Sequence, residues 1–206
     1  MIKLIMIRKS IFLLLVSSLL THSLFASEDG SGLYVGVGVG STAYVDNGFA
    51  KEQLAKAVTH EIEERGFGAK LYGGYQINKI IGIEIAYIHY GDFSANGNYT
   101  YRAQGASVSA NLGYTFLTGQ LRPYALVGLG CVFSDFPHES VPVDNQSPTL
   151  HIGFGLDYTP KSLGGIGFRG AYESNSFTYL VDENKPEEKT YVQALGVLYL
   201  GCHYKF

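Results

Sequence analysis

The chain has few charged residues, few cysteines and, beyond its N-terminal segment, no long apolar run. Charged residues make up 16 % of the sequence, whereas soluble domains contain roughly 25 %. After residue 26 no apolar run reaches the 18 or so residues of a membrane-spanning helix, so no such helix is expected there. The two cysteines, Cys131 and Cys202, are predicted to face outward on strands that are not neighbours, which argues against a disulfide framework.

Basic residues are also scarce, and this limits the partners of the chain. The formal net charge is −3, and removal of the N-terminal segment takes Lys3, Arg8 and Lys9 with it. The remaining chain is therefore more acidic than the whole. Since nucleic-acid binding requires a basic surface that neutralises phosphates, nucleic acid is excluded as a partner.

Residues 1–26 have the pattern of a secretory signal peptide. A basic start is followed by an apolar core from Ile11 to Leu20, and Ala26 is a suitable cleavage residue. A membrane anchor is the alternative, but the core is shorter than the roughly 20 residues that a spanning helix needs. We therefore expect cleavage, export, and a single mature domain over residues 27–206.

The mature chain consists of segments with strict period-two alternation. In the first, Leu33, Val35, Val37 and Val39 alternate with Tyr34 and three glycines. Such alternation predicts a strand with one apolar face. Seven further segments repeat the pattern, near residues 67–77, 81–88, 106–116, 124–133, 150–158, 166–173 and 192–206.

The connections between these segments distinguish a membrane barrel from a soluble sandwich. They alternate between long polar loops, at 44–66, 91–100, 134–148 and 174–189, and short turns, at 78–80, 117–120 and 159–164. Long external loops and short periplasmic turns are typical of outer-membrane barrels. The sequence thus predicts an all-β fold, an eight-stranded antiparallel transmembrane β-barrel.

Aromatic residues support the same topology, because they recur where the outward rows should leave the hydrocarbon. Aromatic girdles at both interfaces are expected for such barrels. The predicted lower girdle comprises Tyr75, Phe116, Tyr158 and Phe206, and the upper one Tyr87, Phe133 and Tyr172.

The first long loop contains a helical pattern. Phe49, Leu54, Val58 and Ile62 recur at four- or five-residue steps, and Asn47 is a suitable N-cap. We expect a short helix in this extracellular loop, either packed on the barrel mouth or available to a partner.

Several ionisable residues are predicted to point into the barrel. An eight-stranded barrel is just wide enough for side chains to fill it, and charges buried there must pair. The alternation places Lys70 near Glu84 and Asp157 near Arg169 on neighbouring strands, and it also directs Glu173 inward. One interpretation is an ion-pair network that plugs the lumen; the other is a charged gate for ions.

Several motifs resemble the OmpA-like family of small outer-membrane β-barrels. They are Tyr72-Gly-Gly-Tyr-Gln-Ile-Asn-Lys, Gly82-Ile-Glu-Ile-Ala-Tyr, Gly91-Asp-Phe and Arg122-Pro-Tyr-Ala-Leu-Val-Gly-Leu-Gly. The C-terminal row, with Leu198, Leu200, Tyr204 and Phe206, resembles the signal that the outer-membrane assembly machinery recognises.

This resemblance implies a monomeric barrel in the outer membrane of a Gram-negative bacterium. Its partners would be outer-membrane lipid, lipopolysaccharide, the assembly machinery and periplasmic chaperones. The resemblance covers the barrel and not the peptidoglycan-binding domain of full-length OmpA, so we expect no cell-wall tethering.

Three functions follow from the resemblance. The first is a structural or adhesin-like role, in which the loops bind a host or matrix ligand, and the second is a narrow diffusion pore. The third is lipid A modification, for which the nearest match is Tyr172-Glu-Ser-Asn, without the histidine of that motif; His138-Glu139-Ser140 lies in a polar loop. We therefore expect no enzyme and no cofactor, and Asp135, Glu139 and Asp144 are not assigned to a metal site.

Overall fold

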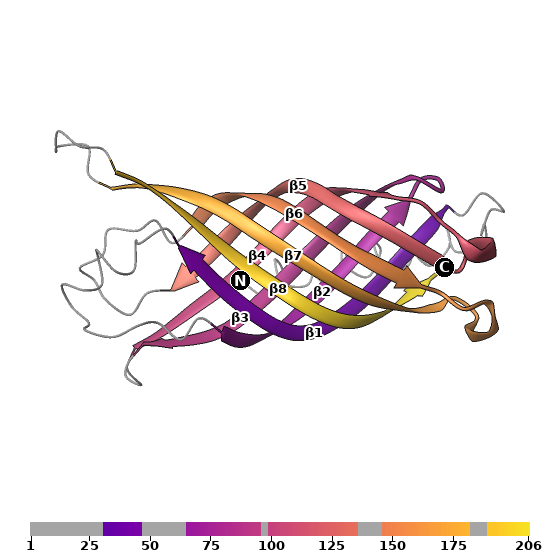
Figure 1. Cartoon of the computed structure of the whole chain (residues 1–206), viewed down its shortest axis with the longest axis horizontal. Coiled ribbons are helices and arrows are strands. Elements are labelled where there is room, and N and C mark those ends of the chain that lie inside the picture. The colour runs from indigo at the N-terminus through magenta and orange to yellow at the C-terminus, as the bar shows by residue number, and fades with distance from the viewer. Residues whose placement is uncertain (1–30, 47–64, 96–98, 136–145, 182–188) are drawn as a thin grey trace, which may run out of the picture.

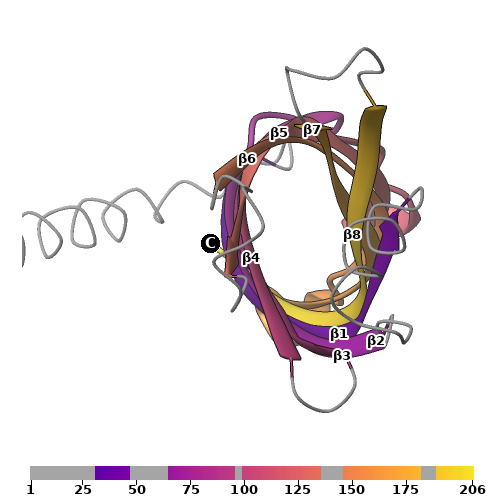
Figure 2. The ribbon, with the colours of Figure 1, turned by 90° about the vertical axis from the view of Figure 1, so that its left-hand side faces the viewer.

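The computed structural model describes residues 31–46, 65–95, 99–135, 146–181 and 189–206, which form a closed barrel of eight antiparallel strands (Figures 1 and 2). Each strand pairs with the next, and β1 pairs with β8. Because closure removes the sheet edges, the barrel wall satisfies its backbone hydrogen bonds without water. The strands are β1 (Gly32–Asp46), β2 (Arg65–Gln76), β3 (Ile81–Ala95), β4 (Tyr99–Gly113), β5 (Leu121–Asp135), β6 (Gln146–Tyr158), β7 (Ile166–Val181) and β8 (Lys189–Lys205).

The short connections lie together at one end of the barrel, which we call the turn end (Figure 1). In the β2–β3 turn, the side-chain oxygen of Asn78 accepts hydrogen bonds from the backbone amides of Ile80 and Ile81, at 2.8 and 2.9 Å. The other two turns contain the 3₁₀ turns η3 (Leu117–Gly119) and η4 (Lys161–Leu163). The three short turns predicted from the sequence are confirmed.

No helix in the described part of the chain is long and apolar enough to cross a membrane. The helix predicted in the first long loop and the predicted signal peptide both lie outside the described residues, so both remain predictions.

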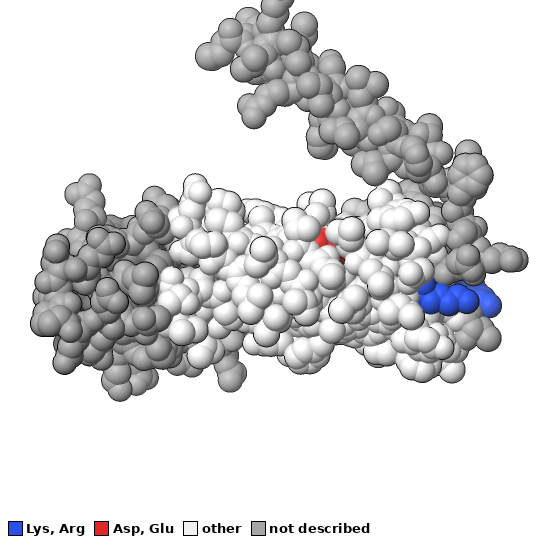
Figure 3. All heavy atoms as spheres, turned by 90° about the horizontal axis from the view of Figure 1, so that it is seen from above, with Lys and Arg blue, Asp and Glu red and all other residues white. Residues whose placement is uncertain are grey.

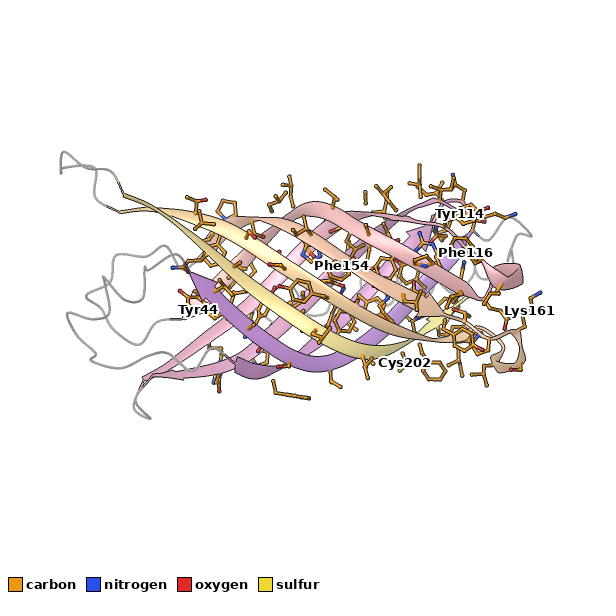
Figure 4. All side chains as sticks on the ribbon, in the orientation of Figure 1. Tyr44, Tyr114, Phe116, Phe154, Lys161 and Cys202 are labelled. Atoms are coloured by element: carbon orange, nitrogen blue, oxygen red, sulfur yellow. The ribbon has the colours of Figure 1, made fainter. Side chains whose placement is uncertain are left out.

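The outer wall of the barrel is an almost uninterrupted apolar surface. Leu200 and Leu129 are 75 % and 72 % exposed, and neighbouring outward positions carry valine, isoleucine and phenylalanine. In the view of Figure 3, basic side chains are visible only at the turn end of the described barrel. A soluble monomer rarely exposes so large an apolar area, so this wall is suited to lipid. The aromatic residues of both predicted girdles lie on this outer face, and Figure 4 shows Phe116 and Tyr114 at the turn end.

The inner face alternates bulky residues with glycine. A β-carbon on Gly36 would overlap the ring of Tyr72, and one on Gly155 would lie 2.6 Å from the hydroxyl of Tyr124. The glycines of the repeated pattern therefore make room for aromatic rings that fill the lumen.

The strands extend further from the turn end than the sequence pattern predicted. β1 ends at Asp46 and β7 at Val181, inside segments that we expected to be loops. In these extensions large side chains also lie inside: Tyr44 and Phe177 are buried, whereas the outward positions carry both apolar Val45 and polar Thr178. Apolar side chains are expected to turn inward where the strands leave hydrocarbon and enter water. The strict alternation of outward apolar residues is lost there, which explains the missed lengths.

Candidate functional site

The lumen contains a network of five charged side chains, Lys70, Glu84, Asp157, Arg169 and Glu173, which we call the lumenal network. Glu84 lies at its centre and is 1 % exposed. Its Oε1 accepts a hydrogen bond from Nζ of Lys70 at 3.0 Å, and its Oε2 accepts one from Nη1 of Arg169 at 2.8 Å. One carboxylate thus joins two cations, which compensates the cost of burying all three charges.

Arg169 carries the network toward the turn end. Its Nε and Nη2 donate to the two carboxylate oxygens of Asp157, at 2.7 and 3.0 Å. Bidentate pairs of this kind are among the stronger charge-assisted hydrogen bonds. Asp157 and Arg169 face each other directly in the β6–β7 register, so strand pairing alone brings them together.

Lys70 extends the network away from the turn end. Its ammonium also pairs with Oε1 of Glu173, which accepts a hydrogen bond from the hydroxyl of Tyr199 at 2.6 Å. The second oxygen of Glu173 lies 3.3 Å from Nε2 of His151. Each cation of the network therefore has two carboxylate neighbours.

Tyrosine rings surround the two cations. The guanidinium of Arg169 lies 4.2 Å from the ring centroid of Tyr72 and 4.5 Å from that of Tyr124. The ammonium of Lys70 lies 5.0 and 5.1 Å from the centroids of Tyr72 and Tyr199. These cation–π distances are within the range of favourable contacts, so the rings both fill the lumen and stabilise its charges.

The structure brings together the five residues that the sequence predicted as a lumenal ion-pair network. Their side chains make more ion pairs than the two that strand order alone predicted. The Arg169–Glu84 and Lys70–Glu173 contacts join strands that are not neighbours. Sequence analysis missed Arg122, whose Nη1 donates to the side-chain oxygen of the inward Asn111 at 2.7 Å. Tyr124 was predicted to face inward, and Arg122 precedes it by two residues. The same alternation therefore directs Arg122 inward.

Buried apolar and aromatic side chains occupy the lumen on the side away from the turns, together with the polar Thr42, Ser134 and Gln193. This layer, the apolar plug, is fully or almost fully buried. It consists of Tyr44, Ile88, Tyr90, Ala103, Val132, Phe177 and Leu195. Figure 4 shows Tyr44 at the opposite end of the barrel from Phe116 and Lys161. A water path through the barrel would have to pass both this plug and the lumenal network.

The Tyr172-Glu-Ser-Asn segment, considered for lipid A chemistry, is not an exposed site in the described part of the chain. Tyr172 faces outward, but Glu173 is 0 % exposed and belongs to the lumenal network. In the lumen, the hydroxyl of Thr159 lies 3.1 Å from Nε2 of His203, yet Nδ1 of His203 has no hydrogen-bond partner among the described residues. A hydrolase of the serine type needs an acid at that nitrogen to orient the base. His138, Glu139 and Ser140 lie outside the described residues.

The predicted assembly signal forms one outward row on β8. Leu198 and Leu200 are exposed, and the rings of Tyr204 and Phe206 pack edge to face with centroids 4.8 Å apart. The row therefore lies on the lipid-facing surface at the closing strand of the barrel.

Comparison with known sequences gives a consistent result. Residues 12–206 match the family model described as outer membrane protein beta-barrel domain. The curated protein "Outer membrane protein A" of Escherichia coli O157:H7 is 36 % identical over 180 residues, which is 84 % of this chain and 47 % of that protein. The protein of the same name from Salmonella typhi is 35 % identical over 138 residues, or 66 % of this chain and 36 % of that protein. The chain thus spans about half or less of these relatives.

Solved structures share the fold at low sequence identity. Neisserial surface protein A has a TM-score of 0.59 and 15 % identity, over 85 % of this chain and 99 % of that chain. Ail, the attachment invasion locus protein of Yersinia pestis, solved in complex with the heparin analogue sucrose octasulfate, has a TM-score of 0.53 and 16 % identity, with the same coverage.

Proposed function

The chain belongs to the outer membrane protein β-barrel family, and we propose that it acts at the cell surface as an adhesin-like protein, with its barrel as the anchor. The observation that carries this proposal is the lumen, which the lumenal network and the apolar plug fill beyond the turn end. A barrel that is closed inside and extended beyond the membrane is suited to presenting loops.

Two further observations support a surface role and indicate the chemistry of the partner. The fold is shared with Neisserial surface protein A and with the attachment protein Ail. The Ail structure contains a heparin analogue, a polyanion, whereas the loops of this chain are rich in acidic residues. These include Glu61, Glu63, Glu64, Glu183, Glu187 and Glu188. Like charges repel, so we propose a ligand with a basic surface rather than a heparin-like one.

Deleting residues 47–64 and bridging β1 to β2 with a short glycine–serine linker should abolish adhesion while leaving the barrel folded. Adherence to host cells and to matrix proteins would be measured for a non-adherent strain that displays either form. Equal surface amounts of the proteins serve as the control, and a parallel deletion of residues 182–188 tests the second acidic loop separately. Unchanged adherence of both deletion variants would contradict the adhesin-like role.

A narrow pore is the second candidate, because the network has alternative pairings. If Glu84 were released, Lys70 would keep Glu173 and Arg169 would keep Asp157. We expect a pore to give unitary conductance steps in planar bilayers that Glu84→Gln changes and the exposed substitution Asp92→Asn does not. A silent bilayer containing correctly folded protein would rule this candidate out.

We also propose that the outward row of β8 is the signal for assembly and chaperone recognition. Replacing Phe206 with alanine should lower the amount of folded protein in the outer membrane and raise the unfolded periplasmic amount, because the terminal ring is lost from the row. Heat-modifiable gel mobility of membrane fractions measures both amounts. The substitution Phe67→Ala, at a more exposed ring on β2, is the control; equal losses for the two variants would remove any special role for β8.

A further inference from the structure

A cavity of about 560 Å³ lies at the turn end, below the lumenal network, and we call it the turn-end cavity. Its walls come from β1, β2, β5, β6 and β8 and from the three short turns. The volume is within the range of about 300–1,000 Å³ that is usual for small-molecule sites. Because the short turns of outer-membrane barrels face the periplasm, this cavity opens toward the periplasm.

The charged residues that line the turn-end cavity are mostly basic. Lys79, Arg122 and Lys205 contribute three cationic groups, and Asp157 contributes the one carboxylate of the described lining. Both oxygens of Asp157 are already bound by Arg169. The cavity therefore has a positive local charge in a chain whose net charge is negative.

Arg122 is the most informative of these groups, because it is only 8 % exposed. Unlike Lys70 and Arg169, its guanidinium has no carboxylate within 4.0 Å in the described part of the chain. Its Nη1 donates to the neutral side chain of Asn111 at 2.7 Å, and its Nη2 donates to the backbone carbonyls of Ile80 and Asn111 at 3.4 and 3.5 Å. Its Nε has no hydrogen-bond partner among the described residues. Burying a cation without a direct counter-charge is costly, and an anion in the adjoining cavity would supply one.

We propose that the turn-end cavity binds a phosphate-type oxyanion. Guanidinium and ammonium groups bind phosphate through charge-assisted hydrogen bonds, and the hydroxyl of Thr159 and the amide of Gln120 add neutral donors to the wall. The phosphate is either a free periplasmic solute or the headgroup of a phospholipid. The second source is compatible with Phe116 and Leu117, which line the cavity and are also exposed on the outer rim.

Inorganic phosphate titrated into the protein refolded in an uncharged maltoside detergent tests the site. We expect saturable shifts of the backbone amide signals of Lys79, Gln120 and Thr159, and no such shifts with chloride at matched ionic strength. The double variant Lys79→Gln/Lys205→Gln should bind about tenfold more weakly, because two charges are removed. Lys161→Gln, a basic residue on the η4 turn outside the cavity lining, is the matched control. Heat-modifiable mobility confirms that each variant is folded.

The same titration in nanodiscs distinguishes the sources. If phosphate still binds in phosphatidylglycerol nanodiscs, the ligand is a free solute. The other outcome is that the amide signals of Lys79, Gln120 and Thr159 are already shifted in those nanodiscs before phosphate is added, relative to their positions in maltoside. If the double variant removes this shift, the ligand is a lipid headgroup. Absence of a saturable shift in both settings, or equal affinities of the double variant and Lys161→Gln, would overturn the proposal.

Discussion

Glu84→Ala should lower the free energy of unfolding by about 3–5 kcal/mol, because several buried donors lose their acceptor at once, each at a cost of about 1–3 kcal/mol. Lys70 and Arg169 lose the carboxylate that joins them, and the hydroxyl of Tyr34, which donates to Oε2 of Glu84 at 2.8 Å, loses its acceptor. Urea unfolding in lipid vesicles measures the effect. Circular dichroism is the suitable probe, because the chain has no tryptophan.

A second ion pair of the same chemistry provides the control. Arg102 and Asp92 lie 2.9 Å apart on the adjacent strands β3 and β4, but their side chains are 53 % and 48 % exposed. Asp92→Asn should therefore cost only about 0–1 kcal/mol, since water already solvates both groups. Equal costs for the two substitutions would mean that the lumen is wet and that the network does not stabilise the barrel.

Leu200→Arg should destabilise the barrel by about 2–4 kcal/mol, although Leu200 has the highest exposed fraction of the large apolar residues described. Leu200 is four residues above Tyr204 on β8. With a rise of about 3.3 Å per residue and a tilt of about 40°, it lies about 10 Å above that ring, near the middle of the apolar band. An arginine there would have to enter hydrocarbon. Urea unfolding in vesicles again gives the cost.

Leu117→Arg is the matched substitution at the membrane boundary. Leu117 is 65 % exposed, but it lies in the η3 turn at the end of the barrel. An arginine there reaches the interface, so the expected cost is about 0–1 kcal/mol. If the barrel wall faced water, both substitutions would be nearly neutral, as surface changes usually are. A neutral Leu200→Arg would therefore contradict the membrane orientation.

The strands were predictable because hydrocarbon imposes one rule along the whole apolar band. Each outward position must be apolar, so Leu33, Val35, Val37 and Val39 alternate with small or polar residues over the full height of the wall. The rule ends where the strands enter water. The extensions that contain Tyr44 and Phe177 no longer keep their apolar residues only on the outer face, and they were expected to be loops.

The lumenal network was predictable only in part, for a related reason. Alternation gives the side of the sheet on which a residue lies, and strand order gives its neighbours. Asp157 and Arg169 could therefore be paired from the sequence, since they face each other on adjacent strands. Contacts across the lumen depend on how the sheet closes and on its register, and no local pattern encodes these.

By itself the sequence determined the all-β class, the strand order, the apolar outer wall and the five inward charges of the lumenal network, because each of these follows from period-two alternation and loop length. Only the tertiary structure decided that Glu84 joins Lys70 to Arg169, that an apolar plug lies above them, and that Arg122 lines a basic cavity below. The physical reason is that these contacts join side chains across the lumen, and their distances are set only when β8 pairs with β1 and closes the barrel.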